Sequence, residues 1–150
     1  MEMGMKQIAN ECFFAWVESE IRNGRSVMFR VKGNSMMPLL RNGEDEVVVG
    51  PYDKNELKPL DVILFRQAGR HILHRMIQKR GTHYRMQGDG VCRFYEECEE
   101  TDIIGVMKRV CRPSGKVIET VSIGWRLESR LWLGLGRFRG IVLRVLNHCS

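Results

Sequence analysis

The chain of 150 residues has few of the features that build metal sites or disulfide frameworks. Its five cysteines are an odd number, and no two of them form a Cys-x-x-Cys pair. The absence of that spacing excludes the common zinc-binding patterns. Cys92 and Cys98 are close enough in sequence to bridge, but reduced thiols in a cytosolic protein are expected instead. We therefore expect no metal and no other cofactor.

Long apolar runs are missing as well. No stretch of the sequence approaches the roughly 18 uncharged apolar residues that a membrane span requires. The first residues include acidic side chains and lack the apolar core of a secretory signal. From these absences we predict a cytoplasmic protein, whose only contact with a membrane would be peripheral.

The positive charge of the chain is concentrated toward its C-terminus. The net charge is +6, while the apolar fraction of 43% and the charged fraction of 28% are ordinary for one globular domain. Residues 108–150 contain nine Lys and Arg against two Asp and Glu, whereas residues 1–107 contain fifteen against sixteen. A basic tail can face nucleic acid, anionic lipid or an acidic protein, or it can be only a solvated face.

Residues 5–22 are predicted to form an amphipathic helix, and a β-rich segment follows. The predicted buried stripe of the helix is Met5, Ile8, Cys12, Trp16 and Ile21, widened by Phe13 and Val17. Alternating or short apolar runs between turn residues predict strands over 27–32, 47–49, 61–66, 71–79, 83–87, 103–110 and 117–121. Several short strands between two helical ends predict a mainly β domain of the α+β class.

Residues 126–147 are predicted to form a basic amphipathic helix, which three glycines weaken and are able to split. Its apolar stripe consists of Leu127, Leu131, Leu135, Phe138, Val142 and Val145. A second, basic stripe of the helix consists of Arg130, Arg137 and Arg144. Two interpretations stay open: the apolar stripe packs on the sheet or on the first helix, or the helix lies on a membrane surface. The predicted units are an N-terminal helix (1–26), a β-rich domain (27–122) and a helical tail (123–150).

Ser35 lies in a run that is typical of a tight turn. Gly33 permits backbone angles that other residues resist, and Pro38 limits how the chain leaves the turn. Such a turn can aim the serine hydroxyl and nearby N–H groups at one point, which supplies a nucleophile and oxyanion donors together. Taken alone, however, a serine in this setting is usually an ordinary turn residue.

His74 is the candidate base for Ser35. On the predicted strand over residues 71–79, His74 shares one face with apolar side chains, while Arg75 points to the opposite face. An apolar setting favours the neutral imidazole, which can accept a proton near neutral pH. A lone histidine on such a face is more often a structural residue of the core or the sheet edge than a catalytic base. The assignment of His74 as a base therefore depends on the neighbouring motifs.

Two carboxylates are candidates for the group that orients the imidazole of His74. Asp89, in a Gly-Asp-Gly turn, is the first, because a turn carboxylate can accept the second imidazole proton and hold the tautomer. Glu96 is the second. It begins an acidic run over residues 96–102, which we expect to be solvated.

Five short motifs follow one another in the order of a known superfamily. They are Gly33-Asn34-Ser35-Met36-Met37-Pro38, then Gly43 with a valine run at 47–49, then Leu60-Asp61-Val62-Ile63-Leu64-Phe65, Leu73-His74-Arg75 and Gly88-Asp89. Over residues 27–110 this order resembles the signal peptidase I and LexA-like superfamily of serine peptidases. Leu60 stands where that superfamily usually has glycine. Histidine at the base position, rather than lysine, is similar to archaeal and endoplasmic-reticulum signal peptidases.

The resemblance implies a fold and a site. The implied fold is a coiled β-sheet half-barrel of the LexA and signal-peptidase type, with an N-terminal helix and a basic C-terminal helix. The implied site is Ser35 as nucleophile, His74 as general base, Asp89 as orienting acid with Glu96 as the other candidate, and Met36 and Pro38 beside the substrate. The resemblance also implies a preference for small substrate side chains.

The predicted function is a serine endopeptidase that cleaves an extended peptide segment laid beside the active-site sheet by a Ser–His mechanism. The expected partners are a peptide or protein substrate and, through the C-terminal helix, an anionic membrane surface, and no nucleic acid is expected. Two alternatives stay open. One is a catalytically degenerate, peptidase-like module that binds peptides or a partner, and the other is a regulator that binds nucleic acid through the basic tail.

Overall fold

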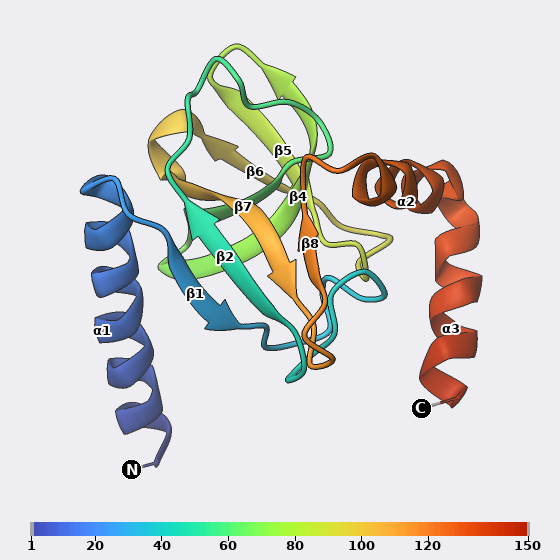
Figure 1. The fold of residues 1–150 in the computed structure, drawn as a ribbon, viewed down its shortest axis with the longest axis horizontal. Coiled ribbons are helices and arrows are strands. Elements are labelled where there is room, and N and C mark those ends of the chain that lie inside the picture. Colours follow the sequence, from blue (N-terminus) through green and yellow to red (C-terminus); the bar gives the residue numbers. More distant parts are fainter. Residues whose placement is uncertain (1, 150) are drawn as a thin grey trace.

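The computed structural model describes the backbone of residues 2–149 and the side chains of residues 10–146, with helices at both ends of a β-sheet (Figure 1). The helices are α1 (Glu2–Arg22), α2 (Ile123–Gly134) and α3 (Arg139–Cys149), with 3-10 turns η1 (Glu100–Asp102) and η2 (Gly136–Phe138). The strands are β1 (Val27–Arg30), β2 (Glu46–Gly50), β3 (Val62–Gln67), β4 (Arg70–Arg80), β5 (His83–Gln87), β6 (Glu96–Glu99), β7 (Ile103–Cys111) and β8 (Val117–Glu119). All seven predicted strands are present, with modest shifts at their ends.

The strands form one antiparallel sheet that curls into a half-barrel. The strand order is β1-β2-β7-β3-β4-β5-β6, and β8 pairs with the end of β7. In Figure 1, α1 stands on one side of the sheet, and α2 and α3 stand on the other. The mixed α+β class, the curled sheet and the helical ends that the sequence predicts are therefore confirmed.

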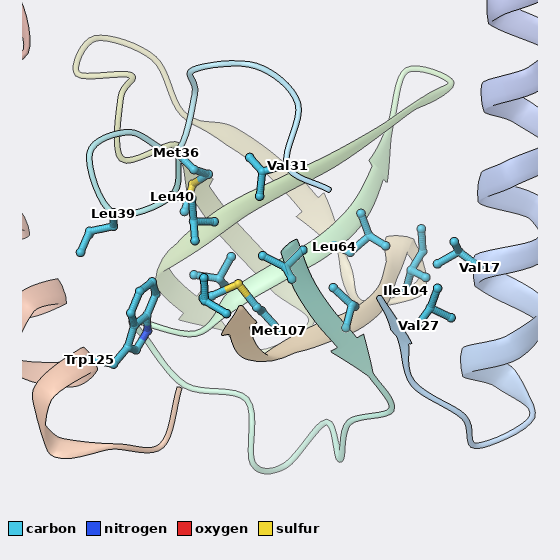
Figure 2. Packing of buried hydrophobic residues seen from close by; sticks show 14 of the residues in the cluster. Val17, Val27, Val31, Met36, Leu39, Leu40, Leu64, Ile104, Met107 and Trp125 are labelled. Carbon is cyan, nitrogen blue, oxygen red and sulfur yellow. The ribbon is translucent and has the colours of Figure 1, made fainter. Parts of the chain in front are cut away.

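The strand β3 is a continuous apolar run because it is covered on both faces. Val62 and Leu64 belong to the larger cluster of buried side chains, and Ile63 and Phe65 belong to a smaller cluster on the opposite face. Figure 2 shows the larger cluster, which extends from α1 across the sheet to Trp125 of α2. Both helical ends are thus attached to the sheet through one core.

The buried face of α1 differs from the predicted stripe. Of the predicted members, Val17 and Ile21 are buried and Phe13 is half-buried, Cys12 and Trp16 are exposed, and Met5 and Ile8 lie outside the described side chains. The helix contacts the sheet mainly at β1 and β7. Only the row that contains Val17 and Ile21, four residues apart, faces these strands, so the rest of the stripe stays outside the core.

The strand β6, which the sequence does not predict, falls in the acidic run that is expected to be solvated. The side chains of Glu97 and Glu99 are 66% and 47% exposed, in agreement with that expectation, whereas Glu96 is only 20% exposed. The segment pairs with β5, which places Arg85 directly opposite Glu97. Their side chains form an ion pair at 3.1 Å, and opposite charges across a strand pair offset repulsion within the acidic run. The alternation of β6 places Cys98 in the smaller core cluster.

Cys98 is expected to resist alkylation in the folded protein. Burial, with added repulsion from nearby carboxylates, raises the pKa of its thiol to about 12, and only the thiolate reacts. Iodoacetamide at about pH 8.5 should therefore modify the exposed Cys12 and leave Cys98 intact until denaturant is added, as peptide mass spectrometry would measure. Equal modification of the two thiols in the folded protein would contradict the placement of β6.

The C-terminal segment forms two helices, and its packed face is not the predicted one. The break lies at Gly136, whose φ of 51° falls in the left-handed region. Trp125, Ser129 and Trp132 of α2 are buried against the sheet domain. Of the predicted apolar stripe, Val142 is half-buried, and the exposed members are Leu127, Leu131, Leu135, Phe138 and Val145. The helix does pack on the sheet domain, but it does so through its tryptophan face.

Candidate active site

Ser35 lies in the turn between β1 and β2, and two glycines hold this turn in place. Gly33 adopts a φ of 90°, which favours glycine, and its N–H donates to Oδ1 of Asn42 at 2.8 Å. The N–H of Gly90 donates to the carbonyl oxygen of Ser35 at 2.8 Å. The turn that the sequence predicts around Ser35 is therefore present, and it is tied to the loop that follows β5.

His74 projects from β4 with its side chain almost fully buried. Its Nδ1 atom lies 2.9 Å from Oε2 of Glu96. A carboxylate in this position accepts the Nδ1–H proton, which leaves Nε2 as the free base of the ring. The ring of Phe65 packs edge-on against the imidazole, with 6.3 Å between the ring centroids. The imidazole is thus held by one ionic and one aromatic neighbour.

Gly88 separates the ring of His74 from the backbone of Ser35. Strand β5 ends with Gln87 opposite Arg75, so the next residue passes beside His74. A Cβ atom at position 88 would collide with the carbonyl oxygen of Ser35 and lie only 2.9 Å from Nε2 of the imidazole. Glycine at this position therefore allows the serine turn to approach the histidine.

Asp89 does not orient His74, and the prediction that it does is corrected by the geometry. Its carboxylate accepts two hydrogen bonds from Arg75, Nε to Oδ1 and Nη2 to Oδ2, each at 2.8 Å. Arg75 and His74 are adjacent on β4, so their side chains point to opposite faces, and Asp89 lies on the arginine side. Glu96, the other candidate from the sequence, occupies the position beside the imidazole.

Arg75 and Asp89 form the centre of a buried polar cluster that α2 completes. Their side chains are 0% and 1% exposed. Nη1 of Arg75 also donates to the carbonyl oxygen of Leu60 at 2.8 Å and to Oγ of Ser129 at 2.9 Å. Nε1 of Trp132 donates to the carbonyl oxygen of Asp89 at 2.9 Å. Helix α2 therefore holds the loop after β5, which contacts both members of the Ser–His pair.

One signal in the sequence could have found the Arg75–Asp89 pair. Strand alternation already places Arg75 on the face opposite His74, and a buried arginine requires an anionic partner. Asp89 in the nearby Gly-Asp motif is a carboxylate within reach of such an arginine. The roles of Ser129 and Trp132 had no comparable signal, because both residues come from a helix more than forty positions further along the chain.

Ser35, His74 and Glu96 line one groove with a volume of about 940 Å³. Its walls come from α1, β1 and the first half of β4, and they are rich in aromatic and aliphatic side chains. Phe14 of α1 and Phe29 of β1 contribute two of these walls, and their rings meet edge-on at 6.2 Å between centroids. The groove thus combines apolar walls with Ser35, His74 and Glu96 and with further polar and charged side chains, among them Arg30, Lys32 and Arg70, and such a mixture is usual in a ligand site.

The remaining predicted site residues are distributed unevenly. Met36 lines the groove, whereas Pro38 lies outside it. No hydrogen bond joins the hydroxyl of Ser35 to the imidazole of His74 within the described part of the chain, a contact that often tightens only when substrate binds. Among the side chains of residues 10–146, no group of three or more His, Cys, Asp or Glu is arranged to hold a metal ion.

The chain matches no protein-family model, no curated protein and no solved structure among those compared with it. A functional assignment therefore depends on the geometry of the groove and on the five motifs that resemble the signal peptidase and LexA-like superfamily. Ser35, His74 and Glu96 supply that geometry, since all three reach one groove from three separate segments of the chain.

Proposed function

We propose that this protein is a serine endopeptidase of the signal-peptidase and LexA-like type. The observation that carries the proposal is the convergence of Ser35, His74 and Glu96 on one groove, with the carboxylate bonded to Nδ1 of the imidazole. A hydroxyl, an imidazole and a carboxylate in this order are the parts of a Ser–His–acid triad. The carboxylate of the proposed triad is Glu96, and Asp89 has a structural role.

In the proposed reaction, Oγ of Ser35 attacks the carbonyl carbon of a substrate peptide bond. Nε2 of His74 accepts the hydroxyl proton and then delivers it to the nitrogen of the leaving amine, which leaves an acyl ester on Ser35. A water molecule, deprotonated by the same imidazole, then attacks this ester, and the serine hydroxyl is restored as the acid product leaves. Glu96 keeps the proton on Nδ1 and stabilises the imidazolium that forms between these steps. The burial of the imidazole limits access of water to the proton-transfer path, so the ion pair acts in a setting of reduced screening.

Strand β1 supports an extended substrate. It lies at the end of the strand order, paired with β2 only, and Met28, Phe29 and Arg30 line the groove. An extended peptide can add to such an edge through backbone hydrogen bonds and place alternate side chains into the groove. The aromatic walls favour apolar side chains in the segment that enters the groove away from Ser35. Small side chains beside the cleaved bond are an expectation from the resemblance.

Two details of the backbone support the family type. Leu60 has a φ of 86°, in the left-handed region, and stands where the superfamily usually has glycine. The His-Arg and Gly-Asp motifs also meet in space, because Arg75 bonds to Asp89 while Gly88 borders His74. These two motifs thus meet in space beside His74, which itself lines the groove.

Ser35→Ala is the direct test of the proposal. Wild-type protein and the variant are incubated with a mixed library of unstructured peptides, and cleavage products are counted by mass spectrometry. The variant is expected to lose at least about 10³-fold in rate, because the nucleophile is absent. Ser114→Ala, in the turn between β7 and β8, is the matched control and should cleave like wild type. Identical products from wild type and Ser35→Ala would refute a serine mechanism.

A second candidate function is a peptide-binding module without catalysis. The absence of a hydrogen bond between Ser35 and His74 within the described residues favours it, since a nucleophile without a bonded base is weak. In that case neither wild type nor Ser35→Ala yields products, while both retain the same library peptides in the groove. Retention that is lost in Phe29→Ala, with no cleavage by wild type, would favour this function.

A further inference from the structure

Helix α2 and the turn after it carry a row of exposed apolar side chains. Ile123 is 85% exposed, Leu127 55%, Leu131 64% and Phe138 56%, and Leu135 is exposed as well. Ile123, Leu127 and Leu131 are four residues apart, so they form one stripe along the helix. These five residues are called the outer face below. In Figure 1, α2 and α3 lie on the side of the sheet away from α1.

The exposure of the outer face follows from how α2 is fixed to the sheet domain. Ser129 accepts a hydrogen bond from Arg75, and Trp132 donates one to the carbonyl oxygen of Asp89. A rotation of α2 that buried Leu127 and Leu131 would break both bonds and leave buried polar groups without partners, which is costly. The outer face is therefore directed away from the sheet domain by specific bonds, and no described element of this chain covers it.

The charges of the segment that contains the outer face are almost all positive. Residues 123–146 contain five arginines and one glutamate. Arg130, Arg137 and Arg144 are exposed, whereas Arg139 is buried and donates to the side chain of Gln87 at 3.0 Å. An apolar helix stripe in a segment whose exposed charges are mainly arginines complements a surface that is apolar inside and negatively charged outside, and a bilayer with anionic headgroups has this composition.

We propose that the outer face binds the surface of an anionic lipid bilayer. The apolar side chains enter the boundary between headgroups and acyl chains, and the arginines contact lipid phosphates. The attachment is peripheral, because no helix within residues 2–149 is long and apolar enough to cross a bilayer. The proposal does not depend on the peptidase function, since none of the five residues of the outer face lines the groove.

The test is sedimentation of the full chain with vesicles of phosphatidylcholine, alone or mixed with phosphatidylglycerol. The wild-type protein is expected to bind the mixed vesicles at least about 10-fold more tightly, and this binding should weaken as salt is raised. Leu127→Gln/Leu131→Gln/Phe138→Gln should reduce binding at least about 10-fold without changing the net charge. Trp16→Gln/Phe94→Gln/Val117→Gln removes three exposed apolar residues elsewhere and is the matched control, which should bind like wild type.

The arginines are tested separately with Arg130→Gln/Arg137→Gln/Arg144→Gln, which should remove the preference for phosphatidylglycerol. Thermal unfolding by circular dichroism identifies any variant that fails to fold. If a variant does fail to fold, the binding of wild-type protein to the two vesicle types still tests the proposal. No binding of wild type to mixed vesicles would overturn the proposal. So would a wild-type dimer, seen by sedimentation velocity, that the triple glutamine variant of the outer face dissociates, since a second copy would then cover this face.

Discussion

Arg75→Met is expected to lower the free energy of unfolding by about 3–5 kcal/mol, because it leaves the carboxylate of Asp89 buried without a partner. Asp89 is 1% exposed and receives both of its side-chain hydrogen bonds from Arg75. Water cannot replace these donors without opening the core under α2. Urea unfolding followed by circular dichroism measures the change, as a shift of the midpoint at constant slope.

An exposed ion pair provides the control for Arg75→Met. Arg85 bonds to Glu97 at 3.1 Å, with side chains 38% and 66% exposed, so Arg85→Met should cost at most about 1 kcal/mol. The double variant Arg75→Met/Asp89→Asn removes both buried charges and should recover part of the lost stability. If Arg75→Met costs no more than Arg85→Met, the cluster under α2 does not hold the loop after β5.

The strands were predictable because their side chains alternate or form short apolar runs. The alternation on β4 also separates His74 from Arg75 correctly, and that separation underlies the whole site. Strand alternation predicts which face a side chain lies on, but it does not predict which residue that side chain bonds to. Asp89 follows β5 in a turn, where the local sequence assigns no face, so its bond to Arg75 rather than to His74 depends on tertiary structure.

The two largest differences between the predicted and the observed elements have the same physical origin. An acidic run has low strand propensity, and β6 is stabilised by partners that the local sequence does not contain: β5 places Arg85 opposite Glu97, and Cys98 packs in the smaller core cluster. Similarly, the leucine stripe of α2 is the more apolar face in sequence, yet the face with Trp125, Ser129 and Trp132 is packed. A serine on the buried face is favourable only because Arg75 donates to it, and helical periodicity does not reveal such a donor.

Glu96→Gln is expected to lower the cleavage rate by about 10²–10⁴-fold while the protein stays folded. The carboxylate of Glu96 lies 2.9 Å from Nδ1 of His74, and its side chain is 20% exposed. An amide can bond to either tautomer of the ring and carries no charge, so it neither keeps the proton on Nδ1 nor stabilises the imidazolium. The rate of peptide cleavage is measured beside the free energy of unfolding for each variant.

A variant of the neighbouring residue Glu97 is the control that distinguishes the orienting role of Glu96 from a general effect of acidic charge. Glu97→Gln removes an equal charge from the same strand, but Glu97 points to Arg85, so its cleavage rate should match wild type. Asp89→Asn should instead lower the free energy of unfolding strongly, because Arg75 is left buried without its anionic partner. Glu96→Gln should leave the protein folded. A Glu96→Gln protein that cleaves at the wild-type rate, beside a stable Asp89→Asn protein that does not cleave, would return the orienting role to Asp89. We thus expect Glu96, beside the imidazole, to affect the cleavage rate and Asp89, beneath α2, to affect stability. Measuring both quantities for each variant distinguishes the two roles.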